Sequence, residues 1–302
     1  MFKQTEKFFR DFEDFMNESN DIPLESEEEI NKALESFMSS MQSGDDNADT
    51  VYDFLELAEL ADTKKDALKY AKQAVELEPD NLDALSLVAE LTCTSKEKLS
   101  DKYEKLIAEA EEALHEQGYF EDDVIGEFWL MFETRPYMRL LQKYADNFVE
   151  CGQMRLAVAQ YEKMLGLCNN DNLGARYSLM HLYAYFEDEQ SALELLKKYP
   201  EEGTQFLLPL SILYYKLGNL RKANHYLKKL CDLNEDTYKF FELITGKSKE
   251  LKKVIENMNP YGYRPCTIEE LIVETEENEF LFSNTTAYII WAKQKLNAKK
   301  KK

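Results

Sequence analysis

One spacing pattern occurs three times in this chain and restricts its fold more than any other feature. The pattern combines large and small residues at helical spacing with a later Ala-x-x-x-Tyr, Leu or Ala segment, and two of the copies have a turn glycine between them. The copies begin at Val51, Leu141 and Leu207, the last two 66 residues apart. Their members are Val51, Phe54, Leu55, Ala58, Ala67, Ala71, Ala74 and Pro79; Leu141, Tyr144, Ala145, Phe148, Gly152, Ala157, Tyr161 and Met164; and Leu207, Leu210, Ser211, Tyr214, Gly218, Ala223, Leu227 and Leu230. The spacing predicts repeated pairs of helices.

This pattern resembles the tetratricopeptide repeat (TPR), a helix pair of about 34 residues. The composition agrees, because only 10 glycines and 7 prolines occur in 302 residues, which disfavours long loops and folds with many turns. TPR units stack into solenoids that usually hold another molecule. We therefore predict an all-α, TPR-like right-handed α-solenoid of antiparallel helix pairs, with irregular capping helices at both ends.

The sequence predicts four consecutive regions. They are N-terminal amphipathic helices (1–47), an acidic TPR-like helical region (48–123), a TPR-like solenoid (124–257), and C-terminal capping helices with a Lys-rich tail (258–302). The solenoid holds helix pairs near 138–171, 173–200 and 204–237, preceded by a helix at 124–132 and followed by a helix at 238–257. In the first region, phenylalanines follow one stripe of a helix at 5–17, and Ser26 with Glu29 forms a capping box. In the last region, Thr267 and Glu270 form another box before a helix at 267–277, and a final helix spans 285–297.

The charge is unevenly distributed along the chain, whose net charge is −21. Residues 1–127 carry 35 acidic and 12 basic side chains, whereas residues 128–302 carry 23 acidic and 25 basic ones. The acidic half repels phosphate backbones, so we do not expect nucleic-acid binding there. It is interpreted as a well-solvated surface or, alternatively, as an arm that docks a basic partner or the neutral half of the chain.

The cysteines and the hydropathy pattern predict a cytoplasmic protein. The five cysteines are widely spaced and include no CxxC pair, which favours buried free thiols over a disulfide framework or a zinc site. The first fifteen residues alternate phenylalanines with acids and do not resemble a secretory signal. No apolar run approaches the roughly 20 residues that span a bilayer.

The second half also resembles the suppressor-of-tumorigenicity-7-like group of TPR proteins, which includes many uncharacterised bacterial members. The segments that carry the resemblance are ETRPYMR (133–139), GQMRLAVAQYEKMLGLCNNDNLGARYSLMHLY (152–183) and NPYGYRP (259–265). Residues 130–297 are covered. The resemblance implies an α-helical repeat fold, no established catalytic activity and partner binding.

Inner positions of the repeats define a candidate partner-binding groove. In order along the chain, these positions hold Arg139, Lys143, Tyr177, His181, Tyr185, Ile212 and Tyr215. Such a groove is basic at one end, aromatic in the middle and apolar at the other end, so it suits an extended peptide or a short helix of a protein partner. Arg139 and Lys143 are expected to orient a carboxylate, although Lys143 alone does not make the carboxylate clamp of other TPR proteins.

Several alternatives to an open groove follow from the same residues. The N-terminal phenylalanine helix or the C-terminal helices could fill the groove as caps, because terminal repeats need covering. The chain could also be a sensing or accessory subunit of an enzyme, or a homodimer that exchanges its N-terminal helices. Arg135, Arg139 and Arg176 are interpreted either as a carboxylate-binding rim or, preferably, as arginines that pair within the fold.

No motif indicates catalysis, a cofactor or a metal centre. The chain has no glycine-rich phosphate loop, no GxSxG and no paired histidine ligands. Asp45, Asn47, Asp49, Asp53 and Glu56 match the positions of oxygen ligands in an EF-hand calcium loop. Thr50 stands where that loop requires glycine, so an acidic linker followed by an N-capped helix is the preferred interpretation.

Overall fold

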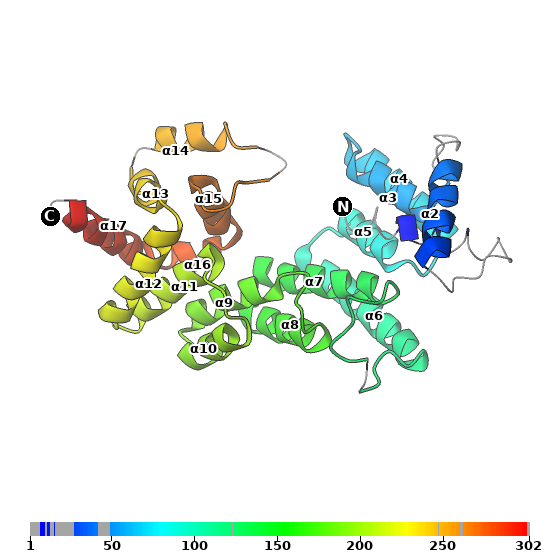
Figure 1. Cartoon of the computed structure of the whole chain (residues 1–302), viewed down its shortest axis with the longest axis horizontal. Coiled ribbons are helices and arrows are strands. Elements are labelled where there is room, and N and C mark those ends of the chain that lie inside the picture. Colours follow the sequence, from blue (N-terminus) through cyan, green and yellow to red (C-terminus); the bar gives the residue numbers. More distant parts are fainter. Residues whose placement is uncertain are drawn as a thin grey trace. The chain divides into compact units, whose positions relative to one another are not determined.

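The computed structural model describes residues 7–9, 11–12, 15, 27–41, 49–122, 124–246, 248–259 and 262–300, and its regular elements are all α-helices (Figure 1). The chain divides into two compact units, residues 1–152 and residues 153–302. The all-α prediction is confirmed. Both units are built from helices that pair with their neighbours in the chain across short turns.

Unit 1 consists of successive helix pairs. Its helices are α2 (Glu27–Met41), α3 (Val51–Glu59), α4 (Lys64–Leu77), α5 (Leu82–Thr92), α6 (Lys96–Glu116) and α7 (Arg135–Glu150). Helix α3 packs on α4, α4 on α5, and α5 on both α6 and α7. The predicted TPR-like unit at 48–81 corresponds to α3 and α4, and the two helices expected at 82–117 are α5 and α6.

Polar caps explain where these helices start. Thr50, Thr63, Asn81 and Ser95 precede α3, α4, α5 and α6, and each side chain accepts a hydrogen bond from the backbone N–H three residues later. Such caps satisfy N–H groups that have no partner inside the helix. At α3 the Asp53 carboxylate also accepts from the Thr50 N–H at 3.1 Å, which completes a capping box.

Unit 2 contains the remaining helices. They are α8 (Met154–Leu167), α9 (Ala175–Phe186), α10 (Glu189–Lys198), α11 (Thr204–Lys216), α12 (Leu220–Leu233), α13 (Thr237–Ile244), α14 (Ser248–Ile255), α15 (Ile268–Glu277), α16 (Glu279–Ser283) and α17 (Thr286–Lys300). The expected pairs at 173–200 and 204–237 are α9 with α10 and α11 with α12. The expected pair at 138–171 corresponds to α7 and α8, and the boundary between the units lies in the turn between them.

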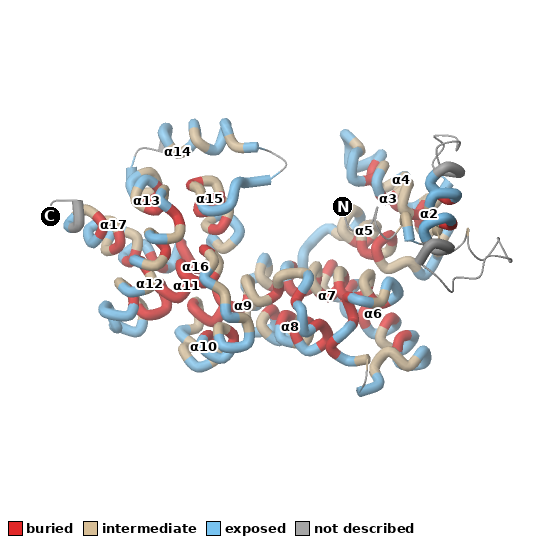
Figure 2. The backbone as a smooth tube through the Cα atoms, in the orientation of Figure 1, coloured by how far each residue is buried: buried red, intermediate tan, exposed pale blue. Residues whose placement is uncertain are grey.

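The repeat pattern has a direct packing explanation. Its small residues, among them Ala74, Ala157 and Ala223, are fully buried and leave room for a neighbouring helix to approach closely. The turn glycines Gly152 and Gly218 adopt φ angles of +71° and +73°, a conformation that favours glycine at the end of a helix. Buried residues follow the helix-to-helix contacts in both units (Figure 2).

Three predicted features of local structure are wrong. The segment expected to form a helix at 124–132 is a series of turns, in which Gly126 has a φ of +104° and the Phe128 and Trp129 side chains are buried. The single helix expected at 238–257 is divided at Gly246 into α13 and α14. The Thr267–Glu270 capping box does not form, because the Glu270 carboxylate accepts from the Cys266 N–H instead.

The predicted boundaries also differ from the division of the chain into units. The segment 118–123 lies inside unit 1, although composition and charge change there.

Three of the described phenylalanines of the N-terminal segment pack on α2. The rings of Phe8, Phe12 and Phe15 lie 5.3 to 5.5 Å from the ring of Phe37. Ser26 of the first predicted capping box lies outside the described residues.

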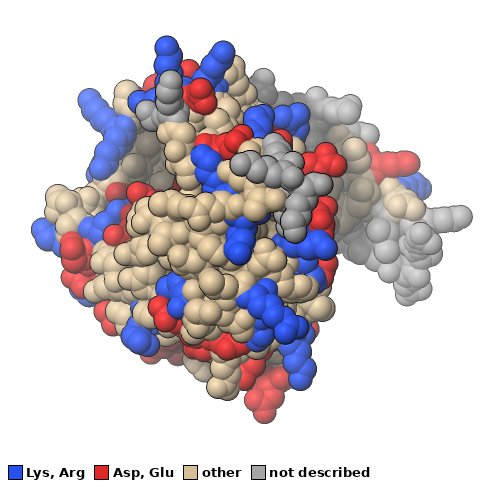
Figure 3. Space-filling view, turned by 90° about the vertical axis from the view of Figure 1, so that its left-hand side faces the viewer, with Lys and Arg blue, Asp and Glu red and all other residues tan. Residues whose placement is uncertain are grey.

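Unit 2 exposes several large apolar side chains. Leu217, Leu220 and Ile290 are 39%, 47% and 55% exposed. In Figure 3, uncharged residues cover most of the middle of the face that is viewed, and charged side chains lie mainly around its edge. Among the described residues, none of the helices combines the length and apolar character needed to cross a lipid bilayer.

Replacement of Leu55 tests the core of unit 1. Leu55 is fully buried in a cluster with Val51, Ala74 and Ala84, so Leu55→Ala should lower the free energy of unfolding by about 2–5 kcal/mol. Leu60, which is 73% exposed at the end of the same helix, provides the matched control, and Leu60→Ala should change it by less than about 0.5 kcal/mol. Urea unfolding followed by circular dichroism measures both, and equal effects would contradict the packing described.

Candidate functional site

The inner face of unit 2 carries five of the predicted site residues. Tyr177, His181 and Tyr185 lie one turn apart along α9, and Ile212 and Tyr215 lie on α11. Helices α15, α16 and α17 contact α9 and α11. The C-terminal helices of the chain therefore cover the face on which a groove was predicted.

Helix α15 contacts this face through two buried carboxylates. The Glu274 side chain is 6% exposed and places Oε1 2.8 Å from Nε2 of His181, whose Nδ1 lies 2.9 Å from the carbonyl oxygen of Tyr177. One turn earlier, Glu270 accepts hydrogen bonds from the Thr204 hydroxyl and the Cys266 N–H, both at 2.9 Å. Buried carboxylates are stable only when such partners replace water.

Helices α16 and α17 continue the contact with aromatic residues. Phe280 packs edge-on against Tyr185, with ring centroids 5.6 Å apart. The buried Tyr288 hydroxyl donates to Oγ of Ser211 at 2.9 Å, and the Trp291 ring lies 5.3 Å from the ring of Tyr215. Each of these side chains on α9 or α11 thus has a partner from the C-terminal helices.

This packing leaves little of the predicted groove accessible. His181 and Ile212 are fully buried, whereas Tyr177, Tyr185 and Tyr215 are half-buried. The arrangement matches the alternative in which the C-terminal helices cap the repeats. While α15–α17 are in place, His181 and Ile212 have no surface for a partner.

Arg139 and Lys143 belong to α7 in unit 1. The Arg139 guanidinium makes a bidentate contact with Asp83 of α5, at 3.0 and 2.6 Å, and the two side chains are 12% and 4% exposed. Lys143 contacts Oγ of Ser86 at 3.0 Å and Oε1 of Glu90 at 2.8 Å, with about a third of its side chain exposed. Arg139 therefore joins α7 to α5, and Lys143 lies at the edge of a cleft.

That cleft, which we name the α5–α7 cleft, has a volume of about 580 Å³. It is lined by Glu90, Cys93, Thr94, Ser95, Lys96, Leu99, Tyr103, Lys143, Asp146, Asn147 and Glu150. Most of these side chains are polar. The Tyr103 hydroxyl donates to Glu90 at 2.7 Å, and burial, together with this carboxylate, raises the pKa of Tyr103, so the phenol remains a donor at neutral pH.

Asn147 is the most informative residue of the α5–α7 cleft. It is 3% exposed, and its Nδ2 donates to the Lys96 carbonyl oxygen at 2.9 Å and to Oγ of Ser100 at 2.7 Å. These two contacts define which end of the amide is nitrogen. Its Oδ1 is buried without a hydrogen-bond partner, and an unsatisfied buried acceptor costs about 1–3 kcal/mol. The cleft thus contains a fixed acceptor that a donor group could satisfy.

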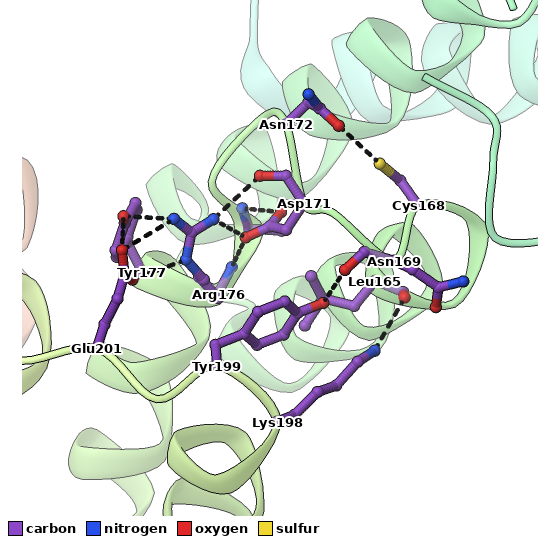
Figure 4. Close-up of polar contacts among 11 residues, drawn as sticks. Leu165, Cys168, Asn169, Asp171, Asn172, Arg176, Tyr177, Lys198, Tyr199 and Glu201 are labelled. Atoms are coloured by element: carbon purple, nitrogen blue, oxygen red, sulfur yellow. Dashed lines mark hydrogen bonds and ion pairs between the residues drawn. The ribbon is translucent and has the colours of Figure 1, made fainter. Parts of the chain in front are cut away.

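The arginine cluster around Arg176 is part of the fold (Figure 4). The Asp171 carboxylate accepts from the N–H groups of Ala175 and Arg176 at 2.8 and 2.9 Å and pairs with the Arg176 guanidinium at 2.9 Å. Arg176 also contacts Glu201 at 3.0 Å and stacks on the Tyr177 ring. Burial raises the pKa of the Asp171 carboxyl against the opposing effect of Arg176. The preferred interpretation, arginines that pair within the fold, describes this cluster.

The calcium hypothesis falls partly outside the described residues, because Asp45 and Asn47 are not among them. Asp53 is described, and its carboxylate contacts Lys7 as well as Thr50. No group of three His, Cys, Asp or Glu side chains suited to a metal ion occurs in the described parts of the chain.

Sequence reasoning missed two sets of residues. Glu270 and Glu274 are one turn apart, beside the apolar positions Ile268, Leu271 and Ile272 of α15, a pattern that could have indicated a helix buried on both sides. Asn147 lies one turn after Lys143, so the sequence could have placed both residues on the same face of α7. It could not have shown that the Asn147 Oδ1 is buried without a hydrogen-bond partner.

No protein-family model matches the sequence, and a search among curated proteins gave no match. Among solved structures, the chain is similar to YrrB, described as a TPR protein with an unusual peptide-binding site. The sequences are 17% identical, the aligned region covers 66% of this chain and 92% of YrrB, and the TM-score is 0.40. At this TM-score the similarity gives no information about a binding site in this chain. The TPR-like description rests on the helix pairs of the chain itself.

The contact between α17 and α11 can be measured with two conservative substitutions. Tyr288→Phe and Ser211→Ala each remove one side of a buried hydrogen bond. Tyr288→Phe should lower the free energy of unfolding by about 1 kcal/mol, and Ser211→Ala by more, because it also removes the hydrogen bond from Ser211 to the Ala223 carbonyl oxygen. The double variant should lose less than the sum, giving a coupling of about 0.5–1 kcal/mol. Strict additivity in urea unfolding would mean that α17 does not dock on α11 in this way.

The Arg139–Asp83 pair provides a similar test in unit 1. Asp83→Ala leaves the guanidinium of Arg139 without its bidentate partner and should lower the free energy of unfolding by about 3 kcal/mol. Asp83→Leu combined with Arg139→Met removes both charges and should recover much of that loss. Thermal and urea unfolding of the three proteins decide the result, and a harmless Asp83→Ala would show that the pair is dispensable.

Proposed function

We propose that this chain is a non-catalytic TPR-like scaffold that binds a peptide segment of a protein partner in the α5–α7 cleft. The observation that carries the proposal is the buried, unpaired Oδ1 of Asn147 among the residues that line this cleft. A peptide in extended conformation presents backbone N–H groups that can donate to such an acceptor once the side chains that cover it move aside. The predicted groove residue Lys143 lies beside it and supplies a donor.

The cleft suits a peptide in size and chemistry. Its volume of about 580 Å³ lies within the range of about 300–1,000 Å³ that is typical of ligand sites. Lys143 pairs with Glu90 and Lys96 pairs with Glu150 among the residues that line it, and a peptide could exchange its backbone groups with these partly exposed ion pairs. The inner face of unit 2 is a less suitable site for a peptide, because α15–α17 pack on it.

Two finer assignments belong to the same proposal. We place the protein in the cytoplasm, on the basis of its widely spaced cysteines without a CxxC pair. The relation to the suppressor-of-tumorigenicity-7-like group rests on the segments ETRPYMR and NPYGYRP and implies partner binding without catalysis.

A blocking substitution tests the cleft. Thr94 is an exposed lining residue, so Thr94→Trp should fill the opening with little effect on the core. Peptides are selected on the full chain from a random display library, and their affinities are measured by fluorescence anisotropy. We expect Thr94→Trp to weaken binding at least about tenfold, which corresponds to about 1.4 kcal/mol.

The matched control carries the same bulky residue elsewhere. Glu112 is exposed on α6 and does not line the cleft, so Glu112→Trp should leave the affinity within about twofold of the unmodified chain. Asn147→Leu should weaken binding as well, because it removes the buried acceptor. Equal affinities for Thr94→Trp and Glu112→Trp would refute binding in the cleft.

A further inference from the structure

A second depression in unit 1 shares no lining residue with the α5–α7 cleft. We name it the acidic groove. It has a volume of about 590 Å³ and lies between the C-terminal half of α6, the start of α5 and the segments that lead into α5 and α7. The residues that line the acidic groove are not among the inner repeat positions from which the partner-binding groove was predicted.

The floor of the acidic groove is apolar. Leu82 and Leu85 of α5, Leu106 and Leu114 of α6, and Phe132 before α7 line it. The Phe132 side chain remains 37% exposed, and Leu82, Leu85 and Leu106 are half-buried. Apolar surface in a concave site of this size favours the burial of partner side chains.

The length of α6 creates this floor. Helix α6 has 21 residues, whereas the second helices of the pairs α3–α4 and α11–α12 have 14 each. The seven additional residues extend a helix by about 10 Å. The C-terminal turns of α6 supply Ala110, Ala113, Leu114 and Gln117 to the groove, so the extension adds a surface that a repeat of ordinary length lacks.

The charged residues of the acidic groove all have the same sign. Glu78, Asp80, Glu109 and Glu133 line it, and none of the described residues that line it is Lys, Arg or His. Asp80, Glu109 and Glu133 are exposed. The Arg135 guanidinium, which is not among the lining residues, lies over the Phe132 ring at 4.2 Å, and its Nε donates to the Trp129 carbonyl oxygen at 2.8 Å.

The chain itself already places suitable side chains next to this groove. The Phe9 ring packs against Phe132 with centroids 5.3 Å apart, and Lys7 pairs with Asp53, the neighbour of the lining residue Tyr52. The Phe9 ring therefore contacts a residue that lines the groove, whereas Lys7 pairs with Asp53, which does not line it. A ligand with apolar side chains would extend the contact made by Phe9 over the floor.

We propose that the acidic groove docks a short amphipathic segment of a partner protein in which apolar side chains are flanked by Lys or Arg. The apolar side chains pack on Leu82, Leu85 and Leu106, and the basic groups face Asp80, Glu109 and Glu133. Helix-in-groove recognition requires this combination of an apolar floor and complementary charge. The Lys-rich end of the chain does not fit the floor, because residues 297–302 (NAKKKK) contain no large apolar side chain.

The test uses the full chain and a labelled helical peptide of about 14 residues, with leucines on one face and lysines on the other. A second peptide carries glutamate at every lysine position. Fluorescence anisotropy should show saturable binding of the basic peptide only, weakening as salt increases. No binding of the basic peptide, or equal binding of both peptides, would overturn the proposal.

Variants of the lining residues and of nearby positions on α6 locate the binding. Asp80→Lys combined with Glu109→Lys should weaken binding at least tenfold, whereas Glu112→Lys combined with Glu116→Lys changes the net charge equally outside the groove and should have less than a threefold effect. Ala113→Trp, which fills the groove from an exposed lining position, should abolish binding. Equal losses in the two charge-reversal pairs would mean non-specific attraction and overturn the proposal, as would unchanged binding by Ala113→Trp.

Two other occupants have distinct outcomes. If a second copy fills the groove, light scattering will show a dimer that Ala113→Trp converts to a monomer. If the chain's own tail fills it, the peptide will bind only after residues 299–302 are deleted. Either result would overturn docking of a partner, while Thr94→Trp, at the α5–α7 cleft, should leave the affinity for the basic peptide unchanged.

Discussion

Two buried carboxylates on α15 determine how this helix packs on α9 and α11 in unit 2. An ionised carboxylate that leaves water must find hydrogen-bond donors or an opposite charge. Glu270 reaches the Thr204 hydroxyl of α11, and Glu274 reaches His181 of α9. Because these glutamates are one turn apart, a shift of α15 along its axis would break both contacts with α11 and α9 at once. The contacts therefore define its register, and the hydrogen bond from Tyr288 to Ser211 does the same for α17.

This closure gives the two units different capacities for binding. A ligand for the inner face of unit 2 would have to displace α15–α17 and leave Glu274 and His181 to find other partners. Separating Glu274 from His181 would leave buried polar groups without partners, which typically costs about 1–3 kcal/mol for each group, and a peptide must recover this before any net affinity results. In the α5–α7 cleft of unit 1, by contrast, the Oδ1 of Asn147 has no hydrogen-bond partner. A donor that reaches this oxygen would remove the free-energy cost of an unsatisfied buried acceptor.

The sequence predicted the helix pairs well because their signal is local and repeated. The buried alanines and the turn glycines Gly152 and Gly218 act within one pair, so spacing alone identifies them. The inner positions were also assigned to the correct helices, but their exposure was not predictable, since it depends on α15–α17, the first of which starts at Ile268, 87 residues after His181. The prediction of a helix at 124–132 was wrong for a related reason. Its apolar residues resemble a helix face, yet Phe128 and Trp129 are buried by turns around Gly126.

The α5–α6 hairpin contributes to both of the binding surfaces proposed for unit 1. The α5–α7 cleft uses the end of α5 and the start of α6, through Glu90 and Tyr103, whereas the acidic groove uses the opposite ends, through Leu82 and Leu114. A helix of 14 residues would end at Glu109 and would lack Ala110, Ala113 and Leu114 of the acidic groove. The longer α6 separates them along its axis, so a ligand in one does not compete for the residues of the other. The acidic first half of the chain supplies carboxylates to a groove whose floor is apolar and whose described lining residues include no Lys, Arg or His, which is the basis of the docking proposed for it.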